Sequence, residues 1–369
     1  MCPAQWAAVS DVVSSPPSLP PIHVVAASLL RLGGDTRGPR AYRALGAGAG
    51  ARELALALDI PARERADEVR RAEDDAGRAL AAARALGVEA VAFGAPGYPA
   101  WLSQVPDPPI VLWAKGDWSL LDRPAIAIVG SRKPTAISVA IAERLAGSLA
   151  RAGLVVTSGL AAGVDGAAHE GALRVGGPTV AVLGCGPDVV YPARHASLAA
   201  AVGLKGCLVS EFPPGTPPRT HHFPLRNRII SGLSRGVVVV EAAERSGSLI
   251  TARLALEQGR GVLAVPGCVV SGCHKGCHAL IKDGARLVET VEDVLEEMGW
   301  RPEPSGSSRD KPLFGNDLLN SMEQGVPVTV DRLVGLGARS ASEVLAGLAE
   351  LEVAGCVRRL PGGWFVRLD

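Results

Sequence analysis

The chain has 369 residues, which is too many for one ordinary domain and predicts two or three. Hydrophobic residues make up 47% of the chain, so the composition excludes a largely disordered protein. The 38 basic and 37 acidic residues nearly cancel, which excludes a uniformly basic nucleic-acid binder and leaves room only for a local basic patch.

The N-terminal part of the chain is predicted to be helical after a flexible arm. Residues 1–21 are rich in Ser and Pro, and they lack the basic start and long apolar run of a secretory signal. Residues 22–86 are rich in Ala, Leu and Arg with glycine interruptions, which predicts small helices in a SAM-like or helix-hairpin-helix bundle. No apolar run of about 18 residues occurs, and the seven cysteines fit free thiols. We therefore expect a cytoplasmic protein with no membrane contact.

Residues 87–299 predict a connector followed by an α/β core. Its apolar runs are continuous rather than alternating, as in parallel strands covered on both faces. These runs are Ala125–Val129, Leu154–Thr157, Thr179–Leu183, Val237–Val240 and Val262–Val265. The helices expected between and beside them are Ser138–Arg151, Val164–Val175, Arg194–Ala201, Leu225–Leu233 and Leu249–Gln258. This alternation predicts an extended Rossmann-like parallel sheet whose strands all end on one edge.

The C-terminal part of the chain predicts a small separate domain. Residues 300–312 are polar and contain prolines, which is typical of a linker. Residues 313–369 predict two helices, Val330–Gly335 and Ser342–Ala354, and then a two-stranded wing within Cys356–Leu368. That order of elements is typical of a winged-helix-like domain.

Small residues follow the ends of four predicted strands. Glycine allows close backbone approach, serine and threonine offer hydroxyl groups, and arginine offers a planar fork to a phosphate. Each turn alone is compatible with an ordinary strand-to-helix connection. Because all four should meet along one sheet edge, they predict a phosphate-binding groove. Its expected residues are Gly130, Ser131, Arg132, Ser158, Gly159, Gly184, Ser246, Gly247, Ser248 and Thr251.

A polar and aromatic segment at 221–228, HHFPLRNR, predicts a further part of this groove. An aromatic ring can stack on a base, which contributes about 1–3 kcal/mol per base, and guanidinium groups can hold phosphates. The residues expected to bind are Phe223, Arg226, Asn227 and Arg228. The alternative is that the ring belongs to the core and the arginines pair with acids such as Glu211 or Glu241.

A series of motifs covers about half of the chain in unbroken order. They are IVGSR at 128–132, SGLAAGVDGAAHEGAL at 158–173, TVAVLGCG at 179–186, SEFPPG at 210–215, FPLRNRIISGLS at 223–234, VVVVEAAERSGSLITARLALEQGR at 237–260 and VLAVPG at 262–267. Together they resemble the DNA-processing protein A (DprA/Smf) family. The resemblance implies a homodimeric, non-catalytic protein that binds single-stranded DNA and loads RecA recombinase in natural transformation. It also implies that Asp165 and His169 support the turn after the second strand.

An enzyme on a related Rossmann-like scaffold is the alternative, such as a nucleotide or nucleoside-monophosphate hydrolase of the LOG kind. Those enzymes carry P-G-G-x-G-T-x-x-E, whereas residues 245–251 are RSGSLIT and no Glu follows before Glu257. Glu241 and Glu244 remain possible acids. The chain also lacks G-x-G-x-x-G after its first core strand, so we expect no dinucleotide cofactor.

A cluster of soft ligands near the end of the core suggests a zinc site as a rival hypothesis. It consists of Cys268, Cys273, His274, Cys277 and His278. Zinc prefers such sulfur and nitrogen ligands, but the spacing departs from the standard C-x2-C patterns. We therefore expect no bound metal and a loop that contacts DNA or nothing.

Overall fold

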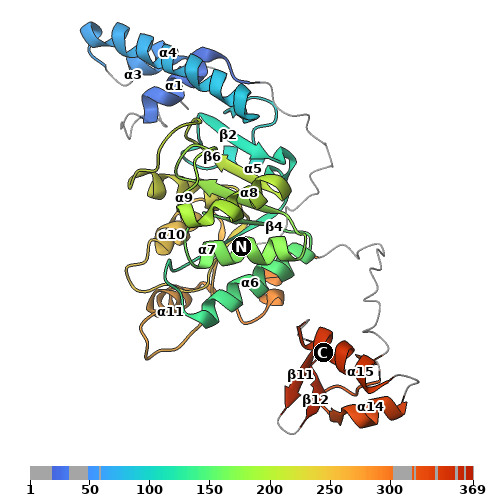
Figure 1. Cartoon of the computed structure of the whole chain (residues 1–369). Helices are drawn as coiled ribbons and strands as arrows, with labels where there is room; N and C mark the ends of the chain where they lie inside the picture. Colours follow the sequence, from blue (N-terminus) through green and yellow to red (C-terminus); the bar gives the residue numbers. More distant parts are fainter. Residues whose placement is uncertain are drawn as a thin grey trace. The chain divides into compact units, whose positions relative to one another are not determined.

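The computed structural model describes residues 19–32, 49–57, 60–301, 318–319, 321–336, 340–353, 356–360 and 363–368. The chain divides into two units, residues 1–303 and 304–369 (Figure 1). The expected arm up to residue 18 and the expected linker from residue 302 onward lie outside the described residues. No helix within the described ranges is long and apolar enough to cross a membrane.

The described N-terminal part of the larger unit is helical, as predicted. Its helices are α1 (Ile22–Leu32), α3 (Ala51–Ala57) and α4 (Ala62–Leu86). Helix α4 is a single helix of 25 residues where short helices were expected, and it ends at Gly87, whose φ of 63° suits a residue without Cβ. One face of α4 packs with α1 and with Trp113 in a shared hydrophobic cluster. The helices therefore share apolar contacts with the neighbouring sheet.

The centre of the larger unit is a nine-stranded sheet with the order β1-β2-β6-β5-β4-β3-β7-β8-β9. The strands are β1 (Glu89–Ala92), β2 (Val111–Gly116), β3 (Ala125–Val129), β4 (Val155–Ser158), β5 (Thr179–Leu183), β6 (Cys207–Ser210), β7 (Gly236–Val239), β8 (Gly261–Ala264) and β9 (Arg286–Leu287). All five predicted apolar runs form strands, and their pairing with one another is parallel.

The sheet is parallel as predicted, except at one edge, where two further strands are antiparallel. Strands β1 and β2 form an antiparallel pair, and β2 is antiparallel to β6. Strands β1 and β2 lie in the proline-containing connector, and neither they nor β6 were among the predicted strands. The parallel part from β6 to β9 still brings its strand ends to one edge, which is the condition for the predicted groove.

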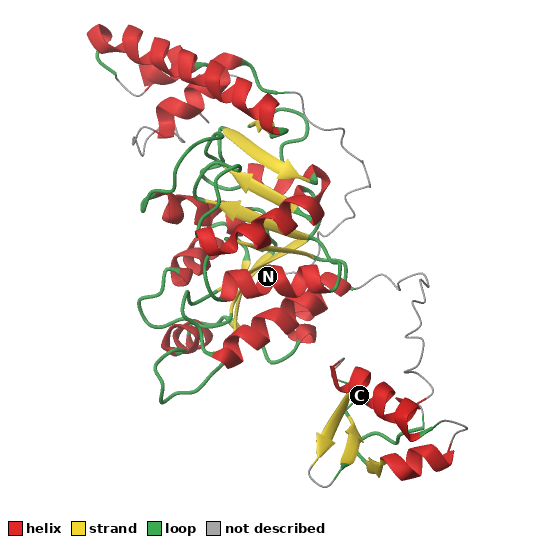
Figure 2. Cartoon of the chain, viewed as in Figure 1, coloured by secondary structure: helices red, strands yellow, loops and turns green. Residues whose placement is uncertain are grey.

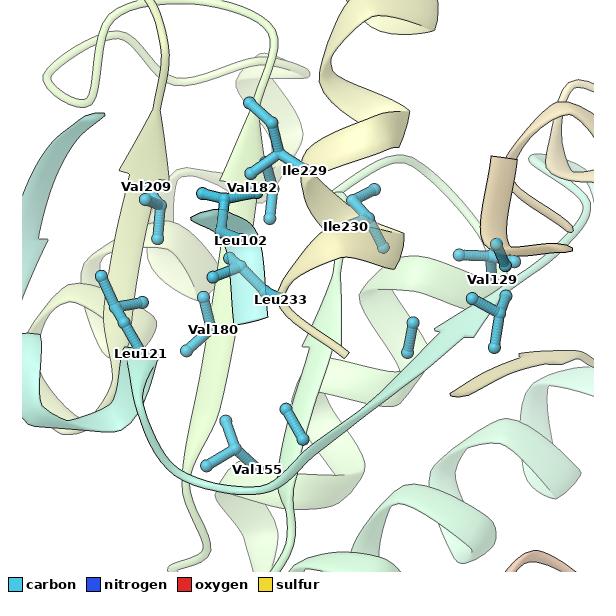
Figure 3. Close-up of a cluster of buried hydrophobic side chains, with 14 of the residues drawn as sticks. Leu102, Leu121, Val129, Val155, Val180, Val182, Val209, Ile229, Ile230 and Leu233 are labelled. Atoms are coloured by element: carbon cyan, nitrogen blue, oxygen red, sulfur yellow. The ribbon is translucent and has the colours of Figure 1, made fainter. Parts of the chain in front are cut away.

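Helices cover both faces of the sheet (Figure 2). They are α5 (Ala100–Ser103), α6 (Ala136–Arg151), α7 (Val164–Arg174), α8 (Ala196–Lys205), α9 (His222–Gly232), α10 (Ser248–Glu257), α11 (Lys275–Lys282) and α12 (Val291–Glu297). Alternate residues of β3 divide between the faces, because Ile128 joins the cluster with α6 and α7 whereas Val129 joins the cluster with α9 and α10. Figure 3 shows the second of these clusters, which contains Ile229 and Ile230 of α9 together with Val182 of β5.

The smaller unit has the predicted winged-helix order. Its elements are β10 (Pro327–Thr329), α14 (Val330–Leu336), α15 (Ala341–Val353), β11 (Val357–Leu360) and β12 (Trp364–Arg367). The strands form a sheet of order β10-β12-β11, and Val328 and Phe365 of that sheet pack with Val344 and Leu348 of α15. This unit therefore has a hydrophobic core of its own.

Candidate nucleic-acid interface

A cavity of about 460 Å³ opens at the carboxyl ends of the parallel strands. It is bounded by the turn after β3, the loop after β4, the start of α9 and the turn before α10. The predicted residues that line it are Gly130, Ser131, Arg132, Phe223, Arg226, Asn227, Ser246, Gly247, Ser248 and Thr251. A second cavity of about 220 Å³ is lined by Gly159 and shares Arg132, Phe223 and Arg226 with the first. The structure thus brings most of the predicted groove together.

The backbone of the turn after β3 is fixed by packing and hydrogen bonds, and the side chain of Arg132 in this turn is exposed. A Cβ atom at Gly130 would lie 2.7 Å from Cγ2 of Val164, so only glycine fits this close approach. The backbone N–H of Ser131 donates to the carbonyl oxygen of Glu241 at 2.8 Å, and the Ser131 carbonyl accepts from Val164 at 3.2 Å. Arg132, next along the turn, is exposed. A fixed backbone therefore presents a guanidinium group at the mouth of the cavity.

Phe223 lies at the boundary shared by the two cavities. The Arg132 Cζ atom is 5.5 Å from the ring centroid, and the ring of Tyr191 is 5.3 Å away at an interplanar angle of 37°. A Cβ atom at Gly184 would lie 3.0 Å from Cδ1 of Phe223, so Gly184 makes room for the ring. Gly184 is not among the residues that line either cavity. Tyr191 was not predicted as a site residue, although it borders the smaller cavity and is 46% exposed.

The turn before α10 lines the larger cavity with the small residues Ser246, Gly247 and Ser248. Gly247 precedes the first residue of α10, and a Cβ atom added there would meet no other atom within 4 Å, so this backbone is bare. The hydroxyl groups of Ser246 and Ser248 lie 2.7 Å apart beside it. The N-terminal end of a helix carries unsatisfied N–H groups and a partial positive charge, which together favour an anion.

Arg226 lines both cavities, yet its guanidinium group is engaged by the protein. Its Nη1 donates to the carbonyl oxygen of Gly159 at 2.5 Å and also to the carbonyl oxygen of Val182. Its Nε donates to Oδ1 of Asn227 at 3.1 Å, and its Nη2 lies 3.9 Å from Oδ2 of Asp165. Arg226 therefore ties the ends of β4 and β5 to α9 and adds positive charge to the cavity wall.

Arg228 does not line either cavity, which corrects its prediction as a phosphate ligand. Its Nη2 donates to both carboxylate oxygens of Glu211 at 2.7 Å, and its Nε donates to Asp107 at 3.0 Å. Two residues apart on a helix, Arg226 and Arg228 cannot share a face. For Arg228, the alternative of pairing with an acid is the correct one.

Ser158 is also placed away from the cavities, which corrects a second predicted contact. Its side chain is fully buried, and its hydroxyl donates to the carbonyl oxygen of Ile128 at 2.6 Å. The hydroxyl therefore links the ends of β3 and β4 across the sheet. Ser158 therefore has a structural role inside the sheet.

Asp165 supports the turn after β4, as expected, whereas His169 contacts Thr179 at the start of β5. Oδ2 of Asp165 accepts from the backbone N–H of Gly159 at 3.1 Å, and burial raises the pKa of Asp165 while Arg226 opposes that shift. The Thr179 hydroxyl donates to a carbonyl oxygen and therefore accepts from Nδ1 of His169, which lies 2.7 Å away. Burial lowers the pKa of His169 to about 3, so the imidazole is neutral in the folded protein.

The neutral His169 makes stability depend on pH in a predictable direction. Its pKa is about 3 when folded and about 6.5 in an unfolded chain, so the unfolded state binds more protons between these values. The wild-type protein should therefore lose roughly 1.4 kcal/mol of unfolding free energy per pH unit below about 6.5 from this group. In denaturant titrations at several pH values, His169→Gln should show a shallower acid slope than the wild type. Equal slopes, also matching the exposed control His221→Gln, would refute this assignment.

The cysteine and histidine cluster does not converge on a common point. Cys268 is exposed, whereas Cys277 is buried and its thiol donates to the carbonyl oxygen of Val239 at 3.6 Å. Nε2 of His278 lies 3.1 Å from the carbonyl oxygen of Gly267. Within the described residues, no group of three or more His, Cys, Asp or Glu side chains is placed to hold a metal ion. The structure gives the zinc hypothesis no support.

The fold and the site define a class of two-unit proteins, in which a Rossmann-like unit with a cavity at its strand ends precedes a winged helix. The sequence model of DNA recombination-mediator protein A matches residues 89–299, and that of the DprA winged helix domain matches residues 303–363. The chain belongs to the DprA/Smf family of DNA-processing proteins.

Relatives of this chain are found in several bacteria. The chain is 44% identical over 283 residues to Protein Smf of Escherichia coli, covering 73% of this chain and 75% of Smf. It is 45% identical over 225 residues to DprA of Bacillus subtilis, covering 61% of this chain and 76% of the B. subtilis protein. The structure of DprA from Streptococcus pneumoniae matches with a TM-score of 0.63 and 36% identity, covering 75% and 94%. The structure of DprA from Helicobacter pylori is described in terms of its single-stranded DNA binding mode. It matches with a TM-score of 0.52 and 30% identity, covering 57% of this chain and 95% of the H. pylori chain.

Proposed function

We propose that this protein binds single-stranded DNA at the cavity above the sheet and acts as a recombination mediator. The observation that carries the proposal is the half-buried Phe223 ring, which is flanked by Arg132 and Tyr191 and lines the same cavity as the turn at the start of α10. A ring with adjacent cations and amides suits a strand whose bases are unpaired, because each base offers a face for stacking. The described binding mode of the H. pylori relative supports this choice of ligand.

The site divides the work of binding between two kinds of contact. Phe223 is placed to stack on a base, while Arg132 and the hydroxyl groups of Ser246 and Ser248 at the N-terminal end of α10 are placed to bind phosphate oxygens. Because the chain as a whole carries a net charge of only +1, the attraction to DNA depends on these local groups. Binding should therefore be sensitive to salt and to single substitutions at the cavity.

The acids near the cavity support a binding role rather than a catalytic one. Asp165 already accepts two backbone N–H groups, from Gly159 and Ala161. Glu241 accepts from the backbone N–H and the hydroxyl of Thr135 at 2.9 and 3.0 Å. Burial would raise the pKa of Glu241, but these hydrogen bonds lower it below its usual value. Both carboxylates thus hold the scaffold.

We also propose that the protein acts as a homodimer in the cytoplasm and loads RecA onto single strands during natural transformation. The support for this is membership of a family described as recombination mediators. Light scattering at several concentrations tests the dimer. Stimulation of RecA filament formation on single-stranded DNA tests the mediator role, and its absence with intact DNA binding would remove that role.

The central experiment is a fluorescence anisotropy titration with single-stranded and duplex oligonucleotides at two salt concentrations. We expect tight, salt-sensitive binding that favours the single strand. Turnover of a nucleoside monophosphate combined with weak oligonucleotide binding would instead support the hydrolase hypothesis.

Arg132→Ala should weaken the binding of single strands at low salt. Loss of one phosphate contact should also reduce the slope of log K against log salt by about 0.7. Arg144→Ala, which removes an exposed arginine from α6 outside the cavity, is the matched control and should leave the slope unchanged. Arg132 does not belong to the site if its variant and the control give the same titration.

A further inference from the structure

The three-stranded sheet of the winged-helix unit has one buried and one exposed face. The register pairs Val328 with Phe365, and both pack into the core of this unit. Because side chains alternate along a strand, the neighbouring positions lie on the opposite face. That outer face consists of Pro327, Thr329, Arg358, Leu360, Trp364 and Val366. Trp364 is in the central strand and is 44% exposed, so the outer face carries an accessible indole ring.

The charged residues in the strands of this unit are all basic. The strands β10, β11 and β12 have the sequences PVT, VRRL and WFVR, which contain three arginines and no acid. Arg367 donates to the carbonyl oxygens of Leu319 and Met322, and Arg359 lies over the Phe365 ring at 5.8 Å. Arg358 is exposed on the outer face, opposite Val366 in the register. The outer face of the sheet therefore carries the Trp364 ring and the Arg358 guanidinium group, and none of its three strands contains an acidic residue.

The helix that would enter a DNA groove in a helix-turn-helix protein has the opposite character. In such proteins the second helix lies in the major groove, between two negatively charged phosphate backbones. The second helix here is α15, and its sequence ASEVLAGLAELEV contains three glutamates and no lysine or arginine. This charge disfavours insertion of α15 into a duplex. The arginines and the exposed tryptophan described above lie on its sheet instead.

We propose that the outer face of the winged-helix sheet is a second binding surface for single-stranded DNA. A base stacks on Trp364 and the adjacent phosphate is held by Arg358, which is the same chemistry that the cavity of the larger unit presents. This inference rests on the proposed function of that cavity. Because the two units are joined in one chain, a strand that reaches both sites gains affinity from the high effective concentration of the second site.

Strand length separates the two sites in an experiment on the full chain. One site of this kind covers roughly 4–16 nucleotides, so an oligo-dT within that length reports on the cavity and a much longer oligo-dT reports on both sites. We expect Trp364→Ala to weaken binding of the long strand about five-fold or more, the low end of a stacking contribution, and to leave the short strand unaffected. Arg358→Ala should act in the same direction, and Trp364→Phe should retain most of the affinity.

Controls and crosslinking make the outcome decisive. Arg332→Ala removes an exposed arginine from α14 and should leave both titrations unchanged. Long strands containing 4-thiothymidine should crosslink within Val357–Arg367, and unlabelled duplex should not displace them. The inference fails if the wild type binds both strands but the titrations of Trp364→Ala and Arg358→Ala superimpose on those of the wild type. It also fails if duplex DNA prevents the crosslink. Failure of the wild type to bind even the short strand would instead overturn the proposed function of the cavity.

Discussion

Arg228→Ala should lower the free energy of unfolding by about 3–5 kcal/mol, because it removes the opposite charge and two hydrogen bonds from a buried carboxylate. Glu211 is only 1% exposed and receives two hydrogen bonds from the Arg228 guanidinium group. Equilibrium unfolding in urea, followed by circular dichroism, measures the change. The variant should unfold at a lower denaturant concentration than the wild type.

Two further variants separate this buried pair from an ordinary surface charge. Arg253→Ala breaks an exposed pair with Glu257 and should cost less than about 1 kcal/mol. The double variant Arg228→Met, Glu211→Leu removes both buried charges and should recover much of the lost stability. A fully stable Arg228→Ala protein that has lost DNA binding would return Arg228 to the DNA site and contradict the structural role.

Phe223→Ala should weaken binding of single-stranded DNA by about 1–3 kcal/mol, or roughly 5- to 150-fold in Kd. The ring is half-buried and contacts Arg132 and Tyr191 at the boundary of the cavities, so its loss removes a stacking surface. An anisotropy titration with labelled oligo-dT measures the effect. Urea unfolding of the same variant shows whether the core remains intact.

Leu225→Ala is the matched control for this substitution. Leu225 is in the same helix and is 40% exposed, but it is not among the residues that line either cavity. Its loss should leave the titration unchanged, and Phe223→Trp should retain tight binding because it keeps an aromatic face. An unchanged titration for Phe223→Ala would show that the ring serves only the packing of the protein.

Much of the fold could be predicted from local patterns in the sequence. The runs at β3, β4, β5, β7 and β8 are continuous and apolar because both faces of these strands are covered, and that property is visible without tertiary information. The small residues that follow several of these runs also stand out in the sequence, so the turns at the strand ends could be predicted as well. Strands β1 and β2 escaped prediction because they lie among the prolines of the connector and pair antiparallel at the edge.

Strand direction and turn chemistry are local properties, so they were enough to predict that four small-residue turns and the segment 221–228 meet at one edge of a parallel sheet. Which side chains face the cavity depends instead on the tertiary structure. Packing of Ile229 and Ile230 against the sheet sets the rotation of α9, which directs Arg226 to the ends of β4 and β5 and Arg228 to Glu211. The space for Phe223 beside Gly184 likewise depends on two segments far apart in the chain. Such choices depend on long-range packing, which no local pattern encodes.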